Sequence, residues 1–118
     1  MSTATTDTTF VRSQDVEWEA AGDGIRRQIL SHGPDLMMVR VDFKAGAVGA
    51  AHHHPHRQVT YVAAGSFEVR IDGGQQVLRP GDSFFVRAEL VHGVVALEDG
   101  TLIDVFTPAR EDFLPVRD

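Results

Sequence analysis

Cysteine is absent from the 118-residue chain, so disulfide bonds and thiolate metal sites are both excluded. Lysine is almost absent, because Lys44 is the one lysine among 11 basic residues and the others are arginine. The planar guanidinium group of arginine suits carboxylate recognition, so an acidic small molecule is an acceptable partner.

Long apolar stretches and excess positive charge are missing too. No run approaches the roughly 18 apolar residues that a membrane span needs. The N-terminal MSTATTDTTF lacks the basic start and apolar stretch of a signal peptide. A cytoplasmic location fits the absence of cysteine, and we expect a cytoplasmic protein. Acidic residues outnumber basic ones by 17 to 11, and the net charge of -6 argues against nucleic acid or an anionic membrane as the main partner.

Short runs rich in β-forming residues, each ended by Gly, Pro or Asp, fill most of the chain, with no sustained helical period. Within one run, Val39, Val41 and Phe43 share a face. The expected strands are residues 24–30, 36–43, 57–64, 66–71, 75–78, 83–87, 91–97 and 101–107. This pattern predicts an all-β sandwich or barrel of antiparallel strands. We expect residues 1–14 to be a poorly ordered arm or an edge strand, and residues 15–118 to form a single domain.

The stretch AAHHHPHRQ, residues 50–58, holds four histidines in five positions. Side chains two apart in an extended segment point to the same side, so His52 and His54 could reach one metal ion while His53 points away. Pro55 interrupts the cluster and a predicted strand follows it, which argues against a cloning tag. A solvated histidine-rich loop without metal is the alternative, and a metal would need a further ligand from elsewhere in the chain.

The spacing around this cluster resembles the first motif of the cupin family, which reads Gly, five residues, His-x-His, three or four residues, Glu, six residues, Gly. Gly46, His52, His54 and Gly65 stand at matching positions, and Gln58 occupies the Glu position. Every spacing of the motif, over residues 46–65, is kept.

The second cupin motif is matched in part over residues 81–96. It reads Gly, five residues, Pro-x-Gly, two residues, His, three residues, Asn. Gly81 and His92 stand at the Gly and His positions, whereas Ala96 replaces the Asn. The segment VRAELVH, which ends at His92, also departs from the proline-rich turn of the motif.

The resemblance implies a single-domain cupin fold, a jelly-roll-like antiparallel β-barrel also called a double-stranded β-helix. It also implies one divalent metal ion, with His52, His54, Gln58 and His92 as its ligands. Three neutral imidazoles and one amide oxygen leave the ion most of its charge, so it would act as a Lewis acid or bind an anionic oxygen. Such ligands suit zinc, nickel, iron, manganese and copper alike.

Asp104 lies in LIDVF, residues 102–106, where both faces of the expected strand are otherwise apolar. A carboxylate there should be buried or face a cavity, and this is costly unless the group is paired or used. One interpretation is a structural aspartate paired with an arginine. The other is a cavity carboxylate that moves protons, with a pKa raised by burial.

HPHRQVTYV, LRPGDSFFV and especially DVFTPAREDF resemble the small single-domain cupins of pectin degradation, the KdgF type. In that family, the metal site opens the ring of 4,5-unsaturated monouronates from pectate and alginate lyases. The products are linear 4-deoxy-5-keto uronates. The resemblance assigns functional positions to Asp104, Phe106 and Arg110, beside the metal ligands. It also implies a homodimer, in which the arm and residues 24–30 could add to a partner's sheet edge.

Three other functions stay open at this point. The same ligands serve metal-dependent dioxygenases, and a polyketide-cyclase type of cupin would need a larger, more aromatic cavity than a chain with 8% aromatic residues suggests. A non-catalytic domain that binds a sugar acid or a metal is the third possibility.

Overall fold

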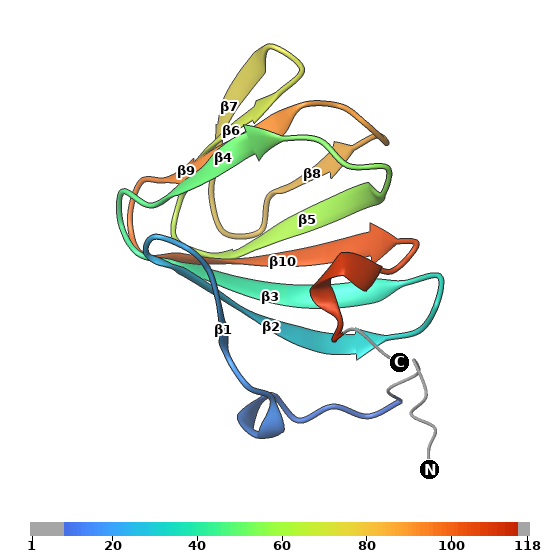
Figure 1. Ribbon diagram of the computed structural model, residues 1–118. Helices are drawn as coiled ribbons and strands as arrows, with labels where there is room; N and C mark the ends of the chain where they lie inside the picture. The colour runs from blue at the N-terminus through green and yellow to red at the C-terminus, as the bar shows by residue number, and fades with distance from the viewer. Residues whose placement is uncertain (1–8, 116–118) are drawn as a thin grey trace.

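Two antiparallel sheets face each other and form a jelly-roll-like barrel (Figure 1). The protein is represented by a computed structural model that describes residues 9–115, so the first eight residues of the expected arm lie outside the described residues. The strands are β1 (Glu19–Gly22), β2 (Ile25–His32), β3 (Met37–Phe43), β4 (Val48–His52), β5 (Arg57–Ala64), β6 (Phe67–Ile71), β7 (Gly74–Leu78), β8 (Ser83–Val86), β9 (His92–Ala96) and β10 (Gly100–Thr107). Their order is β1-β2-β3-β10-β5-β8 in the six-stranded sheet and β4-β9-β6-β7 in the four-stranded sheet.

All the strands expected from the sequence are present, and the all-β fold class is confirmed. Two strands were not expected, β1 and β4. Their sequences, EAAG and VGAAH, contain small residues and no apolar alternation, and most of their side chains are exposed. Two short 3-10 turns, η1 (Ser13–Asp15) and η2 (Glu111–Phe113), complete the described part of the chain.

The apolar core lies between the two sheets, and part of it also forms the wall of a cavity. Along β3, Val39, Val41 and Phe43 point inward as the alternation predicts, and Val39 is fully buried. Phe43 meets Phe67 of the opposite sheet edge to face, with ring centroids 5.1 Å apart. Each such side chain contributes roughly 1.5–3 kcal/mol to stability by burial. This contact packs the six-stranded sheet against the four-stranded sheet.

The structure explains why the second glycine of the first motif, Gly65, must be a glycine. Its φ of 73° lies in the left-handed region, which side chains with a Cβ rarely adopt. A Cβ at this position would also collide with the carbonyl oxygen of Asp99 and with Gly100. The turn after β5 therefore depends on a residue without a side chain.

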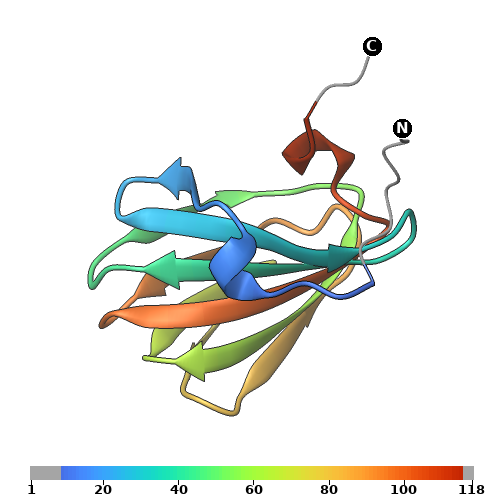
Figure 2. The ribbon, with the colours of Figure 1, turned by 90° about the horizontal axis from the view of Figure 1, so that it is seen from below.

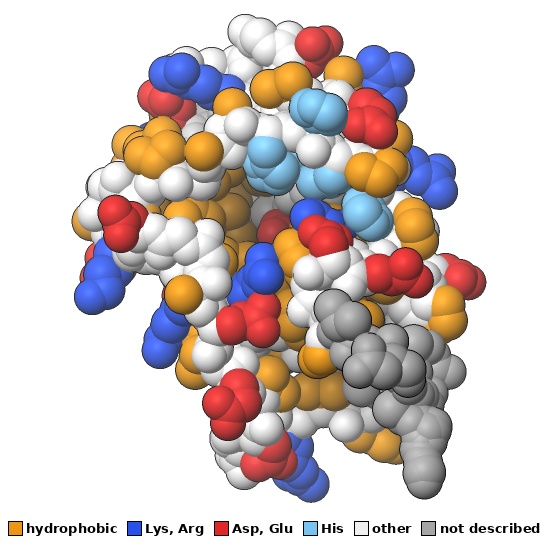
Figure 3. Space-filling view, in the orientation of Figure 1, with side chains coloured by type: hydrophobic (Ala, Val, Ile, Leu, Met, Phe, Trp, Pro, Cys, Tyr) orange, Lys and Arg blue, Asp and Glu red, His pale blue; other side chains and the backbone are white. Residues whose placement is uncertain are grey.

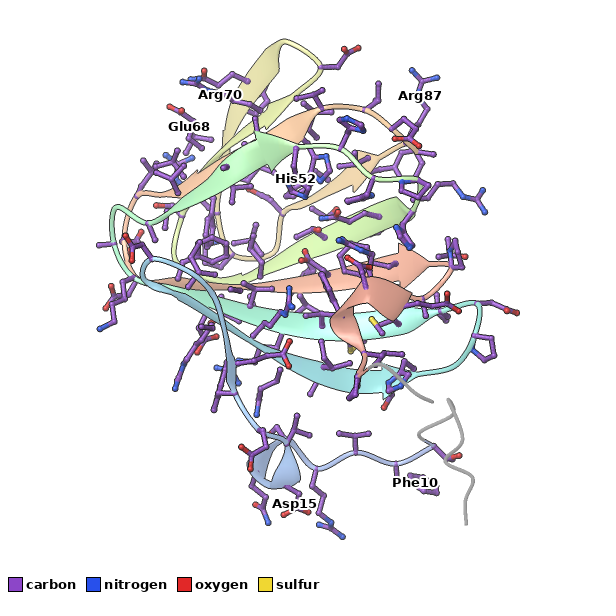
Figure 4. All side chains as sticks on the ribbon, in the orientation of Figure 1. Phe10, Asp15, His52, Glu68, Arg70 and Arg87 are labelled. Carbon is purple, nitrogen blue, oxygen red and sulfur yellow. The ribbon has the colours of Figure 1, made fainter. Side chains whose placement is uncertain are left out.

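The N-terminal segment lies on the outer side of the six-stranded sheet (Figure 2). The Gln28 amide of β2 is buried beneath it and donates to the carbonyl oxygens of Ser13 and Val16, at 2.8 and 3.0 Å. Phe10 and Asp15 belong to this segment, remote from the histidines (Figure 4). Among the described residues, no helix has the length and apolar character needed to cross a membrane.

Candidate metal centre

Three histidines converge at the open end of the barrel. His52 ends β4, His92 begins β9, and the two are paired in the sheet, with ring centroids 4.4 Å apart. His54, in the loop after β4, completes the group, and one ring nitrogen from each of the three lies within 4.8 Å of the others. Figure 4 places His52 at the mouth between the two sheets, and Figure 3 shows histidines bordering a hollow with apolar walls.

Hydrogen bonds to backbone carbonyls fix the orientation of all three rings. The Nδ1 atoms of His52, His54 and His92 lie 2.9 Å from the carbonyl oxygens of Ala50, His56 and Leu90, respectively. A carbonyl oxygen only accepts, so each Nδ1 carries the proton in these bonds. In the neutral ring, Nε2 then offers its lone pair, which is the arrangement that metal-binding histidines adopt.

Two observations show that these residues fit a bound cation. The Nε2 atom of His92 is buried and has no hydrogen-bond partner among the described residues. The Nε2 atom of His54 faces the Oε1 atom of Gln58 at 3.1 Å. With a neutral His54 protonated on Nδ1, both of these atoms are acceptors, and a shared cation would satisfy them together.

Burial prepares two of the histidines to act as ligands. It lowers the pKa of His92 to about 4, despite the opposing hydrogen bond to Leu90. Burial, followed by the positive charge of Arg110, also lowers the pKa of His54. Neutral imidazole is the form that binds metals, so a lowered pKa keeps the ligands available at neutral pH.

A hydrogen-bonded chain connects Gln58 to Asp104 on the neighbouring strand. The Gln58 amide donates to the Thr60 hydroxyl at 2.8 Å and lies 3.4 Å from Asp104 Oδ1. The Thr60 hydroxyl donates to the same Oδ1 atom at 2.6 Å. Burial raises the pKa of Asp104 to about 6, although the Thr60 hydroxyl, the charge of Arg110 and the Gln58 amide oppose this shift.

A cavity of about 300 Å³ has Gln58 and several other predicted site residues in its wall. Its walls include His52, His92, Asp104 and Phe106 along with Arg110, which follows β10. The sequence reasoning therefore named side chains that the fold brings to one place, even though they come from distant parts of the chain.

Arg110 lines the cavity, and one edge of its guanidinium group is already hydrogen-bonded to Asp112. Its Nε and Nη2 atoms donate to Asp112 at 3.0 and 2.8 Å, and only 11% of its side chain is exposed. Its guanidinium lies over the rings of Phe113, at 4.1 Å, and Phe106, at 5.1 Å. A substrate carboxylate would therefore have to use the other edge of this fork.

Sequence reasoning missed three residues around the cavity: Thr60, Arg27 and Phe113. Arg27 and Phe113 line the wall of the cavity, and the Arg27 guanidinium lies 3.7 Å from the centre of the Phe113 ring. The only available signal was the strand alternation, which puts Thr60 on the same face as Gln58. For Arg27 and Phe113 no signal existed, because their contact joins β2 to η2.

The two remaining histidines of the cluster do not join the triad. His53 points away, as expected, and its Nδ1 atom pairs with Glu89 at 2.9 Å. His56 contributes its backbone carbonyl to the orientation of His54. The unusual VRAELVH segment packs against this loop, because the Glu89 amide also donates to the His54 carbonyl at 2.7 Å.

Comparisons with known proteins agree with this geometry. Residues 39–106 match the family model described as the cupin domain. The pectin degradation protein KdgF of Dickeya dadantii is 52% identical over 99 residues, which cover 82% of this chain and 90% of that protein.

Two solved structures are similar over nearly their whole length. An RmlC-like cupin from Shewanella frigidimarina superimposes with a TM-score of 0.89 at 44% identity, covering 92% of this chain and 99% of that one. KdgF from a Halomonas species gives a TM-score of 0.87 at 44% identity, covering 91% and 99%.

Proposed function

The chain belongs to the cupin family and, within it, to the KdgF-type proteins of pectin degradation, and from this premise we propose that it is a metal-dependent ring-opening enzyme. Its substrates are the 4,5-unsaturated monouronates released from pectin or alginate, and its products are linear 4-deoxy-5-keto uronates. The observation that carries the proposal is the position of Asp104, which lines the same cavity as His52 and His92.

The cavity supports a small acidic substrate. Its volume of about 300 Å³ is at the lower end of the range for small-molecule sites, which favours a monosaccharide over the polycyclic substrate of a cyclase. Arg110 brings a positive charge to the wall, and the phenyl ring of Phe106 offers an apolar surface to a sugar ring. In the proposal, Arg110 binds the substrate carboxylate and Phe106 holds the ring in place.

A divalent ion held by His52, His54, His92 and Gln58 would supply Lewis acidity toward a substrate oxygen. The proposal leaves its identity open among zinc, nickel, iron, manganese and copper, because the four donors suit all of them.

Asp104 moves the proton in the proposed reaction. It takes the proton of the C1 hydroxyl, and the C1 carbonyl forms as the bond between C1 and the ring oxygen breaks. The electrons of that bond remain on the oxygen attached to C5 as an enolate. When the C5 carbonyl forms, C4 accepts the proton that Asp104 now carries, so no oxidant or reductant is consumed. A carboxyl group with a pKa near 6 suits this exchange at neutral pH.

The test follows the conjugated double bond of the substrate. Metal-loaded protein is incubated with 4,5-unsaturated galacturonate, and ultraviolet absorbance is recorded against buffer that contains the same metal. We expect accelerated loss of absorbance and a linear keto product by NMR. No acceleration with any of the candidate metals would refute the proposal and favour the oxygenase or the binding-protein alternative.

The Asp104→Asn variant tests the role of the carboxylate. An amide keeps the size of the group and an oxygen to accept the Thr60 hydrogen bond, but it cannot take a proton. We expect kcat to fall by roughly 10²–10⁴-fold while the fold and metal content are kept. Full activity of this variant would contradict the assignment of Asp104 as the acid–base group.

A homodimer in the cytoplasm remains part of the proposal. The first part of β2 is paired with β1 of the same chain, so a partner's strand would add at β1 and not directly at residues 24–30. The outer face of the six-stranded sheet offers a second surface: Met38, Val59 and Phe85 are 40%, 49% and 54% exposed. With Val105 they form one row across β3, β10, β5 and β8.

A further inference from the structure

We propose that Thr60 is a positioning residue that turns the oxygen of the Gln58 amide toward the three histidines and holds the Asp104 carboxylate in the cavity. Its effect on turnover rests on the proposed function, whereas its effect on metal binding does not. Thr60 is fully buried and lies directly opposite Asp104 in the β5–β10 pairing. Its hydroxyl is therefore confined to the space between the side chains of Gln58 and Asp104.

The hydroxyl group sets the direction of the hydrogen bonds. A threonine hydroxyl has a single proton, and here it is donated to Asp104 Oδ1 at 2.6 Å. The Thr60 oxygen must then act as an acceptor toward Gln58, whose Nε2 atom lies 2.8 Å away. A carboxylate acceptor at one end of the chain therefore requires the amide nitrogen at the other.

This direction matters because an amide has two ends of nearly equal shape. If the Gln58 nitrogen faces Thr60, the Gln58 oxygen must face His54, and it lies 3.1 Å from His54 Nε2. Without the hydroxyl, the amide nitrogen keeps only its longer contact of 3.4 Å to Asp104. The amide could then turn its N–H groups toward the histidines, where a donor repels a cation.

The same network explains what glutamine does at a position where the cupin motif has glutamate. A glutamate side chain has no N–H group to donate to Thr60 or Asp104, and it would bring a second carboxylate beside the first. The glutamine amide meets both needs, because it accepts on the side of the histidines and donates on the side of Asp104.

Thr60→Val and Thr60→Ser separate the hydroxyl from the methyl group. Valine keeps the shape and removes the hydrogen bonds, whereas serine keeps the hydroxyl. We expect Thr60→Val to weaken the affinity of the metal-free protein for Zn²⁺, measured by calorimetric titration, roughly tenfold or more. We expect Thr60→Ser to restore it. In the metal-loaded enzyme, kcat should fall in Thr60→Val with little change in KM.

Thr101→Val is the matched control. The Thr101 hydroxyl also donates to an aspartate on a neighbouring strand, Asp42, at 2.9 Å, but this bond is outside the cavity. The control should lose stability without losing Zn²⁺ affinity. If Thr60→Val does not fold, comparison of Thr60→Ala with Thr60→Ser isolates the hydroxyl in a smaller side chain.

The outcomes distinguish this inference from the proposed function. Equal Zn²⁺ affinity in Thr60→Val, Thr60→Ser and the parent protein would overturn the positioning role. If the parent protein does not act on unsaturated galacturonate but Thr60→Val still binds Zn²⁺ more weakly than Thr60→Ser, the proposed function fails and the orientation of Gln58 by Thr60 stands.

Discussion

At the residue scale, Asp104 shows how the cavity alters the chemistry of a single side chain. Burial raises its pKa to about 6 from an ordinary value of 3.8, so the folded protein holds its proton more tightly than the unfolded chain does. The stabilisation that this gives is fully present below the ordinary pKa and is lost as the pH rises through about 6. An ionised Asp104 therefore makes the metal-free protein less stable at neutral pH.

Replacement of Asp104 with Asn should accordingly stabilise the metal-free protein at neutral pH. A shift of about two pKa units corresponds to about 3 kcal/mol, since each unit is worth about 1.4 kcal/mol. We expect the free energy of unfolding of the variant, relative to the parent, to rise by up to this amount between pH 4 and pH 7. Urea denaturation of both proteins with a chelator present measures this difference. If the free energy of unfolding varied with pH in the same way in both proteins, a raised pKa of Asp104 would be contradicted.

The sequence predicted some single residues and could not predict others. Asp104 was recognisable because one acidic residue interrupts a strand that is otherwise apolar on both faces. Thr60 was not, because threonine is an ordinary β-forming residue and its partner, Asp104, is remote in the chain. The engagement of Arg110 by Asp112 also depends on the turn that follows β10, which the sequence did not specify.

At the element scale, the cationic side of the cavity comes from Arg27 of β2 and from Arg110, which directly precedes η2. The Phe113 ring lies under two guanidinium groups, with Arg27 of β2 at 3.7 Å and Arg110 at 4.1 Å. Arg27 is also held by Glu19 of β1 at 2.7 Å. The position of η2, and of the positive charge beside it, thus depends on a contact with the six-stranded sheet.

Replacement of Arg27 with Gln should loosen this contact and weaken substrate binding. We expect KM for the unsaturated uronate to rise roughly tenfold, equivalent to about 1.4 kcal/mol, with a smaller effect on kcat. The measurement is steady-state kinetics of the metal-loaded enzyme. Arg26→Gln is the control, because Arg26 points to the other face of β2 and its guanidinium lies 3.8 Å from the centre of the Trp18 ring. Equal KM values in the two variants would argue against a role for Arg27.

The strands differ in how far their sequences reveal them. The expected strand at residues 57–64 coincides with β5, because it combines β-branched residues with a glycine at its end. Residues 48–52 gave no such signal, since VGAAH has neither alternation nor bulk, and β4 forms through its pairing with β9. The strand that delivers His52 was thus one of the two that local sequence did not reveal.

At the scale of the whole molecule, the candidate metal centre joins the two sheets. His52 and His92 belong to the four-stranded sheet, whereas Gln58 belongs to the six-stranded sheet. Which strands become neighbours, such as β10 between β3 and β5, is set by pairings between distant segments that single-strand patterns do not encode. The barrel class was predictable from the strand count and turns, but this arrangement was not.

Removal of the metal should therefore destabilise the barrel as a whole. A ligand at a hundred times its Kd stabilises the folded state by about 2.7 kcal/mol, which corresponds to a Tm change on the order of 10 °C for a domain of this size. We expect a chelator to lower the Tm of the metal-loaded protein by this amount. In His92→Ala, the Tm should not depend on metal. In His53→Ala, the Tm should change with metal as it does in the parent protein, because His53 pairs with Glu89 outside the triad. A Tm unaffected by metal in the parent protein would contradict the bridging role.

The exposed row on the six-stranded sheet leads to a prediction about assembly. If two copies pack through Met38, Val59 and Phe85, light scattering should give the mass of a dimer, and Phe85→Arg should give a monomer. Val77→Arg is the control, since Val77 is 39% exposed but lies on β7 of the other sheet. A monomer at high concentration for the parent protein would contradict the dimer.

The carbonyl contacts of the three histidines have a consequence for protein engineering. Each Nδ1 atom donates to a carbonyl only two residues away in its own segment, so this hydrogen bond of each ring does not depend on cavity side chains. Substitutions in η2 could therefore reshape the pocket while these hydrogen bonds are kept. Substitutions in β10 are more restricted, because Phe106 packs against His54 and Asp104 contacts Gln58. Substrate choice could in this way be redesigned separately from the three histidine donors, but not from Gln58, whose amide is tied to Asp104.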